Sequence, residues 1–242
     1  MPAKESVSLS ELKFETDDNV YAPKPASLLL ADEAIKVIRP GARVLDACTG
    51  SGVVGITIAS QVPHAHVTVS DINEAALAAA RRNASVNGVD IEVVFSSLYD
   101  AFPDDAFDFI TVHPPAVPYP DDADWGLSAG MRVATNGGSD GSELVVRSIA
   151  EAKPHLRKGG RLLLLLPHWS NVPAARTELK KHYRSVTELA RKQVEFFPVK
   201  EGNASPRLLQ HVKDLAASGI IEMTFEKEIP LSIVSVIEAR AD

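Results

Sequence analysis

The sequence has little of several features that mark other classes of protein. It contains a single cysteine, Cys48, so no internal disulfide can form. Its apolar runs are short, such as the one at 162–167, which is far too short to cross a bilayer. No basic leader followed by an apolar stretch opens the chain. We therefore expect a cytoplasmic protein with no membrane partner.

The sequence also has fewer basic than acidic residues. The 32 acidic residues outnumber the 25 lysines and arginines, which gives a net charge of −7. A protein that binds nucleic acid through general phosphate attraction carries the opposite excess, so we expect no nucleic-acid partner. The seven histidines do not cluster with cysteines or carboxylates at ligand spacings, so we expect no metal.

Short apolar runs alternate with helical patterns along the chain, which predicts an α/β domain. A doubly wound parallel sheet with helices on both faces follows from that alternation. Strands are expected at 42–47, 65–70, 91–95, 107–112, 161–166, 186–196, 220–225 and 231–239, the last two as a hairpin. Helices are expected at 27–38, 52–61, 73–87, 140–155, 171–182 and 205–218.

The alternation also predicts how the chain is divided. Residues 1–30 are expected to form an N-terminal arm or lid, with amphipathic character, and residues 31–242 the main domain. Within that domain, the segment 198–230 breaks the alternation and is expected to be an insertion that caps the substrate.

Three glycines follow the first expected strand of the sheet. Gly50, Gly52 and Gly55 read G-x-G-x-x-G, a spacing that permits a tight turn and lets a ligand approach the backbone. Asp71 follows the next strand, where a carboxylate can accept both hydroxyl protons of a ribose. Together these features predict a nucleoside-containing cofactor.

Asp46 indicates which nucleoside cofactor suits the loop. In a dinucleotide site, a pyrophosphate lies on the helix N-terminus, and a carboxylate at the end of the strand would repel it. The same carboxylate suits a ligand with a positive amino group or sulfonium. S-adenosylmethionine carries both groups and a ribose, and it has no phosphate. We therefore predict that the cofactor is S-adenosylmethionine.

The segment 44–52, Val-Leu-Asp-Ala-Cys-Thr-Gly-Ser-Gly, resembles motif I of class I S-adenosylmethionine-dependent methyltransferases. Ser-Asp-Ile at 70–72 is similar to their acidic motif. The resemblance implies a seven-stranded Rossmann-like methyltransferase sheet and an enzyme that transfers an alkyl group to nitrogen. The cofactor-binding residues predicted in this way are Asp46, Ala47, Thr49, Gly50, Gly52, Asp71, Ile72, Ser97, Leu98, His113 and Pro114.

His-Pro-Pro-Ala at 113–116 and Gly-Gly-Ser-Asp-Gly at 137–141 resemble a branch of that class. The branch contains the release-factor glutamine methyltransferases, whose motif is Asn-Pro-Pro-Tyr. In that motif, the asparagine oxygen and a following carbonyl accept hydrogen bonds from a planar NH2 group. This aims the nitrogen at the methyl carbon, while the two prolines stiffen the loop.

The sequence departs from that motif, because His113 replaces asparagine and Ala116 replaces tyrosine. Imidazole accepts a proton near neutral pH, so one hypothesis is that His113 deprotonates a substrate ammonium. The other is that it only hydrogen-bonds the cofactor or a loop carbonyl. Tyr21 and Tyr119 are candidates for aromatic surfaces at the site. The predicted catalytic residues are His113, Tyr21 and Tyr119.

The release-factor enzymes carry an N-terminal recognition domain, whereas only a short arm precedes Tyr21 here. This difference and the 198–230 segment favour a small-molecule substrate. The main expectation is therefore N-methylation of a small amine or amino acid. Methylation of a protein glutamine and cyclisation of the cofactor to azetidine-2-carboxylate stay open, as does a binding module without turnover. The sequence does not indicate the oligomeric state.

Other aromatic residues that could face the cofactor are Trp125, Trp169 and Phe197, although plain packing is the simpler explanation for each of them. Cys48 lies inside the glycine loop with no base nearby, so we expect a small buried residue rather than a nucleophile.

Overall fold

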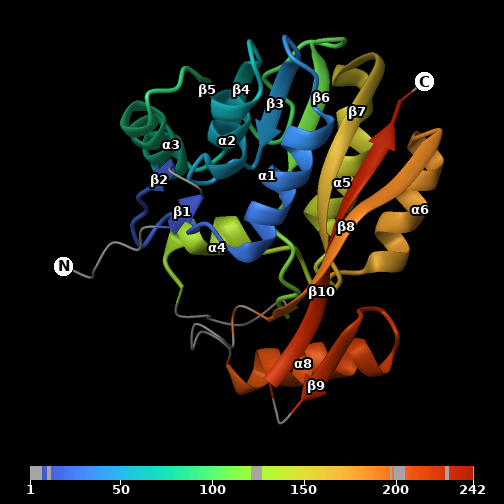
Figure 1. The fold of residues 1–242 in the computed structure, drawn as a ribbon. Helices are drawn as coiled ribbons and strands as arrows, with labels where there is room; N and C mark the ends of the chain where they lie inside the picture. Colours follow the sequence, from blue (N-terminus) through green and yellow to red (C-terminus); the bar gives the residue numbers. More distant parts are fainter. Residues whose placement is uncertain are drawn as a thin grey trace.

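A central sheet of eight strands with helices on both faces forms the body of the protein (Figure 1). This computed structural model describes residues 7–9, 12–120, 127–196, 198, 205–226 and 229–241. The α/β doubly wound fold expected from the sequence is confirmed.

Seven strands follow one another across the sheet in the order β5-β4-β3-β6-β7-β10-β8, and β9 pairs with β10 beside them. Their bounds are β3 (Arg43–Ala47), β4 (His66–Asp71), β5 (Glu92–Phe95), β6 (Phe107–Val112), β7 (Leu156–Pro167), β8 (Ser185–Glu195), β9 (Met223–Glu226) and β10 (Ile229–Arg240). The strands from β5 to β7 are parallel, and β10 is antiparallel to both β7 and β8. The order reverses between β3 and β6, where ligands bind in sheets of this kind.

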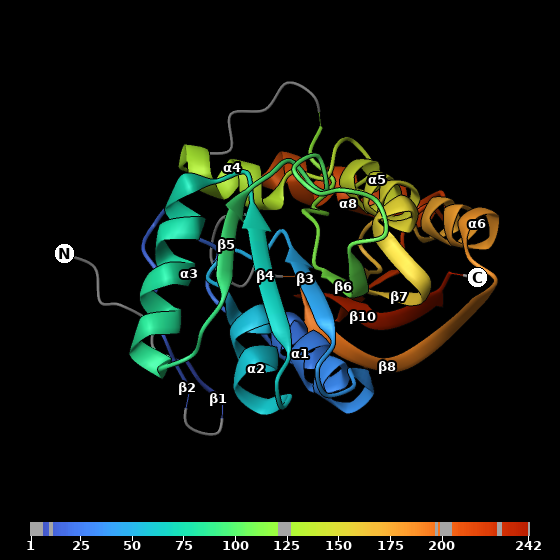
Figure 2. The same cartoon turned by 90° about the horizontal axis from the view of Figure 1, so that it is seen from above.

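The helices divide between the two faces of the sheet. Figure 2 shows α1 (Pro25–Val37), α2 (Val53–Gln61) and α3 (Glu74–Asn87) on one face. The other face carries α5 (Glu143–Ala152) and α6 (Val172–His182). Each face therefore has its own apolar core.

The run of five leucines at 162–166 in β7 shows how the two cores share the sheet. Leu163 and Leu165 belong to the core under α1 and α2. Leu162, Leu164 and Leu166 belong to the core under α5 and α6. All five are at most 1% exposed, so the unbroken leucine run reflects a strand that is buried on both faces.

The N-terminal arm is a β-hairpin rather than the amphipathic segment expected. Its strands are β1 (Val7–Leu9) and β2 (Leu12–Phe14), which pair in antiparallel register. Two asparagines of α3 hold β2 in place, because each amide both accepts from and donates to the backbone of the arm. Asn83 pairs in this way with Glu15, and Asn87 with Lys13.

The segment after β8 contains α8 (Pro206–Ala217) and β9, which lie at the lower end of the molecule in Figure 1. The expected hairpin of the last two strands is confirmed by the pairing of β9 with β10. Leu208 and Val212 of α8 are fully buried in the core that also contains Trp169 and Phe196. The segment is thus packed against the body of the fold.

Besides the arm, a helix and the start of a strand differ from expectation. Helix α4 (Ala129–Thr135) was not predicted, because its seven residues lie in a region rich in glycine and polar residues. Strand β7 begins at Leu156, five residues before the predicted start. A single 3-10 turn that contains Pro154 follows α5, and β7 begins directly after this turn. The strand then runs through Gly159, whose φ is +73°. Within the described ranges, no helix is both long and apolar enough to span a membrane.

A cavity for cofactor and substrate

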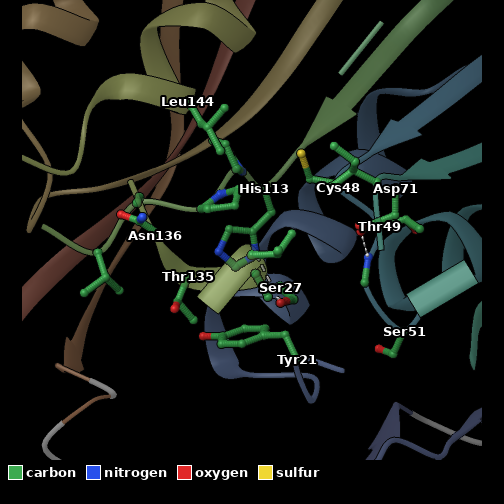
Figure 3. A pocket seen from close by; sticks show the side chains of 18 of the residues that line it. Tyr21, Ser27, Cys48, Thr49, Ser51, Asp71, His113, Thr135, Asn136 and Leu144 are labelled. Carbon is green, nitrogen blue, oxygen red and sulfur yellow. Dashed lines mark hydrogen bonds between the residues drawn. The ribbon is translucent and has the colours of Figure 1, made fainter. Parts of the chain in front are cut away.

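A cavity of about 420 Å³ opens at the carboxyl ends of the parallel strands, where the strand order reverses (Figure 3). The loops after β3, β4, β5 and β6 line one part of it. The other part is lined by α4, α5, the start of α1 with the segment before it, and the end of β7. Most of the predicted cofactor residues lie on this wall. They are Asp46, Thr49, Gly50, Asp71, Ile72, Ser97, Leu98, His113 and Pro114.

The loop after β3 turns sharply through left-handed backbone positions. The φ angles of Cys48, Gly50 and Gly52 are +54°, +56° and +85°. The turn is fixed by the Thr49 amide, which donates to the Ser70 carbonyl at 3.0 Å, and by the Gly52 amide, which donates to Thr49. The loop therefore has a defined shape at the point where a ligand approaches its backbone.

Hydrogen bonds to the Asp46 carboxylate anchor this loop. Its Oδ2 accepts hydrogen bonds from Thr49 Oγ1 at 2.5 Å and from the Gly55 amide at 3.0 Å. Its Oδ1 accepts from Thr111 Oγ1 at 2.8 Å. Burial raises the pKa of Asp46 to about 6, although these hydrogen bonds favour the charged form. A positive ligand group in the cavity would stabilise that charge further.

Asp71 connects the ends of β3 and β4. Its Oδ2 accepts from the Gly50 amide at 2.9 Å, and its Oδ1 accepts from the Asn73 amide at 2.9 Å. Burial raises the pKa of this carboxyl, and the backbone donors oppose that change. Because Asp71 also lines the cavity, it is placed where the sequence predicts a partner for ribose hydroxyls.

The residues present fit S-adenosylmethionine. Ser51 also lines the cavity, and its buried Oγ has no hydrogen-bond partner among the described residues. A Cβ at Gly50 would meet only the Tyr21 carbonyl oxygen, at 3.8 Å, which leaves room beside the loop. Two carboxylates in one small cavity suit a ligand with two positive groups.

Ala47 and Gly52 are not among the described residues that line the cavity. Ala47 is fully buried in the core beneath α5. A Cβ at Gly52 would lie 2.8 Å from Ile56 Cδ1 and 3.1 Å from Ala80 Cβ. A glycine is therefore needed at position 52 for two reasons: the loop packs closely against α3, and the backbone has a positive φ.

Ser97 and Leu98, which the sequence predicts to bind the cofactor, line the cavity after β5. The turn that presents them is held by Ser96 Oγ, which donates to the Leu98 carbonyl at 3.1 Å and accepts from the Ala101 amide at 3.2 Å. Leu98 has a φ of +47°, which brings its backbone to the cavity wall. Ile72, half exposed, forms a neighbouring apolar surface.

His113 stands at the carboxyl end of β6 and lines the cavity near its centre (Figure 3). Its Nδ1 lies 3.2 Å from Ser27 Oγ at the start of α1. The ring of Tyr21 meets it edge-on, with 6.2 Å between centroids. Enclosure by the wall lowers the pKa of His113 to about 4, so the ring is neutral at physiological pH. A base this weak takes a proton from an ammonium only poorly.

The wall beyond His113 is built by close backbone contacts. A Cβ at Gly137 would lie 2.6 Å from the Ala116 Cα, so the loop at 137–141 can press directly on the His-Pro-Pro-Ala segment. Val117 exchanges backbone hydrogen bonds with Thr135 and Gly137. Tyr119 does not line the cavity among the described residues, and its hydroxyl lies 3.3 Å from Thr135 Oγ1. Tyr119 thus supports the wall.

Several lining residues were not found from the sequence. Ser27, Arg132, Thr135, Asn136 and Arg147 all face the cavity from helices or helix ends. They match no motif, and their position depends on how α1, α4 and α5 pack, which periodicity does not indicate. None of the described residues between 198 and 230 lines the cavity, so the expected cap over the substrate is not seen in that part of the chain.

Of the aromatic candidates, Tyr21 and Trp169 line the cavity. Trp125 and Phe197 lie outside the described residues. Cys48 also lines the cavity, and burial raises the pKa of its thiol, an effect that the charges of Asp71 and Asp46 strengthen. A thiol with a raised pKa is a poor nucleophile.

Comparison with known proteins agrees with this geometry. Residues 11–123 match the family model of the methyltransferase small domain. A ribosomal protein L11 methylase from Lactobacillus delbrueckii has the same fold, with a TM-score of 0.57, 17% identity and coverage of 94% of this chain and 84% of that one. A Thermus thermophilus 16S rRNA N2 G1207 methyltransferase, solved with AdoMet and guanosine, gives a TM-score of 0.58 at 16% identity, with 99% and 50% coverage.

The chain therefore has the fold of the class I S-adenosylmethionine-dependent methyltransferases, and residues 11–123 are similar to the methyltransferase small domain. S-adenosylmethionine is accordingly its cofactor. Within that class, it is similar to release factor glutamine methyltransferases. It is 34% identical to the one from Gloeobacter violaceus, over 64% of this chain and 56% of that protein. The corresponding values for Deinococcus radiodurans are 32%, 70% and 62%, so this chain spans less than two thirds of these relatives.

These relatives correct the expected partners. The sequence predicted a small-molecule substrate and no nucleic acid, whereas the relatives are named for a protein substrate and for ribosomal RNA. The prediction was wrong because it took a short arm and an acidic net charge as evidence against macromolecules. Net charge describes the whole surface, and a substrate meets only the part around the cavity.

Proposed function

We propose that this chain methylates the side-chain amide nitrogen of a glutamine in a protein substrate, with S-adenosylmethionine as the methyl donor. The observation that carries the proposal is the neutral His113, followed by two prolines, in the same cavity as Asp46 and Asp71. The names of the relatives support the same substrate class. When bound, the cofactor supplies an electrophilic methyl group on its sulfonium.

The residues of the chain would hold the two reactants in line. Asp46, Ser51 and the Gly50 backbone would bind the amino-acid part of the cofactor, and Asp71 its ribose. Ile72 and Leu98 offer apolar contact for the adenine. Such positioning accounts for much of the rate enhancement in a displacement reaction, because the reacting atoms must lie about 3–3.5 Å apart.

His113 would act as a hydrogen-bond acceptor in place of the family's asparagine. If Nδ1 donates its proton to Ser27 Oγ, then Nε2 carries a free lone pair that can accept from the substrate NH2. An amide nitrogen attacks as the neutral NH2 group and needs no deprotonation beforehand, so a neutral acceptor with a low pKa suits it. The proton that the methylated amide then loses would pass to water. The Pro114 and Pro115 rings restrict the backbone beside it.

The proposal is tested by methyl transfer to a purified translation release factor, with S-adenosylmethionine labelled in its methyl group. We expect label in one glutamine-containing peptide, located by mass spectrometry. Small-subunit ribosomal RNA is offered in a parallel reaction. Label in the RNA and none in the protein would contradict the proposal, as would methylthioadenosine formed without an acceptor.

Two variants connect that activity to His113. His113→Asn restores an acceptor and should retain turnover, with the same pH profile between pH 6 and 8. His113→Phe fills the space without an acceptor and should reduce turnover about 100-fold, in line with the loss of one polar contact in a transition state. If the turnover of the unmodified protein instead changes with pH near 6.5, and the asparagine variant does not show this change, His113 accepts a proton in the reaction.

A further inference from the structure

The side-chain amide of Asn136 lines the cavity in one fixed orientation. Asn136 directly follows α4, and its backbone amide donates to the Arg132 carbonyl at 3.0 Å. Its Oδ1 accepts from the Gly138 amide at 3.0 Å. Because a backbone N–H can only donate, the side-chain oxygen must face Gly138 and the NH2 group must point away from it. Among the described residues, no hydrogen bond reaches Asn136 Nδ2.

Backbone pairing fixes Asn136 against the chain that follows His113. Asn136 is bridged to Val117 in parallel register, with the Val117 amide donating to the Thr135 carbonyl at 2.8 Å and the Gly137 amide donating to the Val117 carbonyl at 3.0 Å. Partners in such a bridge carry their side chains on the same side, and both Val117 and Asn136 line the cavity. Figure 3 shows the Asn136 nitrogen turned toward the part of the cavity where His113 lies.

A donor and an acceptor in one cavity are complementary to a primary amide. A planar carboxamide presents an NH2 group beside a carbonyl oxygen, whereas an ammonium only donates and a carboxylate only accepts. His113 Nε2 is the acceptor in the proposed function, and Asn136 Nδ2 supplies the donor. Val117 and Trp169, which are 1% and 5% exposed, add apolar surface to the same cavity. Such surface suits the two methylene groups of a glutamine side chain.

We infer that Asn136 donates a hydrogen bond from Nδ2 to the carbonyl oxygen of the glutamine that is methylated. His113 then holds the nitrogen of the substrate amide and Asn136 holds its oxygen, so the two residues together fix the plane of the amide. Asn136 is thus a specificity-determining residue. The inference rests on the proposed function and adds the second polar contact with the substrate side chain.

One variant removes the donor and keeps the support of the side chain. Asn136→Asp has nearly the same shape, and its carboxylate still offers an oxygen to the Gly138 amide, but the NH2 group is replaced by a second acceptor. Gln193→Glu makes the same change of charge on the exposed strand β8, away from the residues that line the cavity. It is therefore the matched control.

Binding of three short peptides tests the contact without turnover. The protein, saturated with S-adenosylhomocysteine, is titrated with acetyl-Gly-X-Gly-amide in which X is glutamine, its methyl-ketone analogue 5-oxonorleucine, or norleucine. The ketone keeps only the carbonyl oxygen, and norleucine has neither polar group. Asn136→Asp should weaken binding of the glutamine and ketone peptides about tenfold, as the loss of one hydrogen bond predicts. It should leave the norleucine peptide within twofold, and Gln193→Glu should change none of the three.

Nuclear magnetic resonance gives a direct readout of the same contact. The side-chain NH2 signals of Asn136, assigned from their absence in Asn136→Asp, should shift with the glutamine and ketone peptides and not with the norleucine peptide. An equal loss of affinity for all three peptides in Asn136→Asp would overturn the inference, because the contact would then not be with the side-chain carbonyl. No preference of the unmodified protein for glutamine over norleucine would also overturn it.

Kinetics with the release factor give a further measurement. Asn136→Asp should lower kcat/KM about tenfold and leave the affinity for S-adenosylmethionine within twofold. A parallel loss of cofactor affinity would place Asn136 against the cofactor and overturn the inference, as would Asn136-dependent binding of an oligoribonucleotide in place of the glutamine peptide. If the release factor is not methylated while the Asn136-dependent preference for glutamine is still measured, the proposed function fails and the amide contact stands.

Discussion

Asp46 is a carboxylate at the cavity wall that is only 2% exposed, and its three hydrogen-bond donors all belong to the protein. It connects Thr49 and Gly55 of the loop to Thr111 of β6, so it sets the shape of the loop before any ligand arrives. The same burial that makes these contacts strong disfavours the negative charge. The burial of Asp46 therefore links the stability of the protein to pH.

This linkage predicts the pH dependence of stability. The pKa of Asp46 lies near 6 in the folded protein, above its ordinary value of 3.8, so the folded state holds the proton more tightly. The contribution of Asp46 to the free energy of unfolding therefore falls as pH rises from about 4 to about 6. A shift of roughly two units corresponds to about 3 kcal/mol.

The measurement compares Asp46→Asn with the unmodified protein by urea denaturation between pH 4 and 7. The variant should gain relative stability as pH rises, whatever its stability at pH 4. Asp90→Asn, which removes an exposed carboxylate, is the control for net charge. Parallel curves for Asp46→Asn and the unmodified protein would rule out the raised pKa.

At the scale of elements, α3 connects the N-terminal arm to the glycine loop. Asn83 Nδ2 donates to the Ser51 carbonyl at 2.9 Å and to the Glu15 carbonyl at 3.1 Å. Asn87 makes the same kind of contact with Lys13 but does not reach the loop. One buried amide thus connects the arm, the helix and the cofactor cradle.

The two asparagines form a matched pair for mutation. Asn83→Ala leaves backbone groups of Glu15 and Ser51 unpaired and should lower the free energy of unfolding by about 1–3 kcal/mol. It should also weaken cofactor binding, measured by calorimetry, because the loop loses a support. Asn87→Ala should cost less stability and leave cofactor affinity unchanged. Equal effects of the two variants on affinity would refute the connection.

The strands and long helices were predictable because burial gives them strong patterns. The alternation of strand and helix, the G-x-G-x-x-G turn and the leucine run of β7 each follow from local sequence. The arm and α4 were not predictable, because tertiary contacts define them. The arm depends on amides of Asn83 and Asn87, which are distant in sequence, and α4 depends on Gly130 packing against Asn19.

The residues that line the cavity were also predictable only in part. Asp46, Gly50 and Asp71 belong to a motif in which each residue follows a strand directly, so the sequence placed them at the correct edge of the sheet. Arg132 follows no strand and matches no motif. Its position depends on the direction in which a short helix crosses the ends of the strands, which the sequence alone does not give.

For the molecule as a whole, His168 joins the α8–β9 segment to the sheet. It is 1% exposed, with Nδ1 at 2.7 Å from Glu222 Oε2 and Nε2 at 2.9 Å from Ser235 Oγ. The Glu222 amide also donates to the His168 carbonyl at 2.8 Å. A side chain with both ring nitrogens engaged across three elements fixes their mutual position.

His168→Ala should loosen this segment more than the rest of the molecule. Hydrogen exchange should increase in α8 and β9, and the free energy of unfolding should fall by about 2–4 kcal/mol, because a cavity and unpaired polar groups replace the ring. His211→Ala removes only an exposed contact with the Ser139 carbonyl and should have a much smaller effect. An equal increase of exchange in α1, α2 and α3 would contradict a local role.

The position of β10 between β7 and β8 has a consequence for how the chain is made. Both neighbours leave the ribosome before the strand that joins them, and the register pairs Arg161 with Arg240 and Ser185 with Arg240. Until β10 emerges, β7 and β8 each expose an unpaired edge. Such long-range closure is slow, and open edges invite association with other nascent chains. The enzyme is thus expected to depend on chaperones while it is being synthesised.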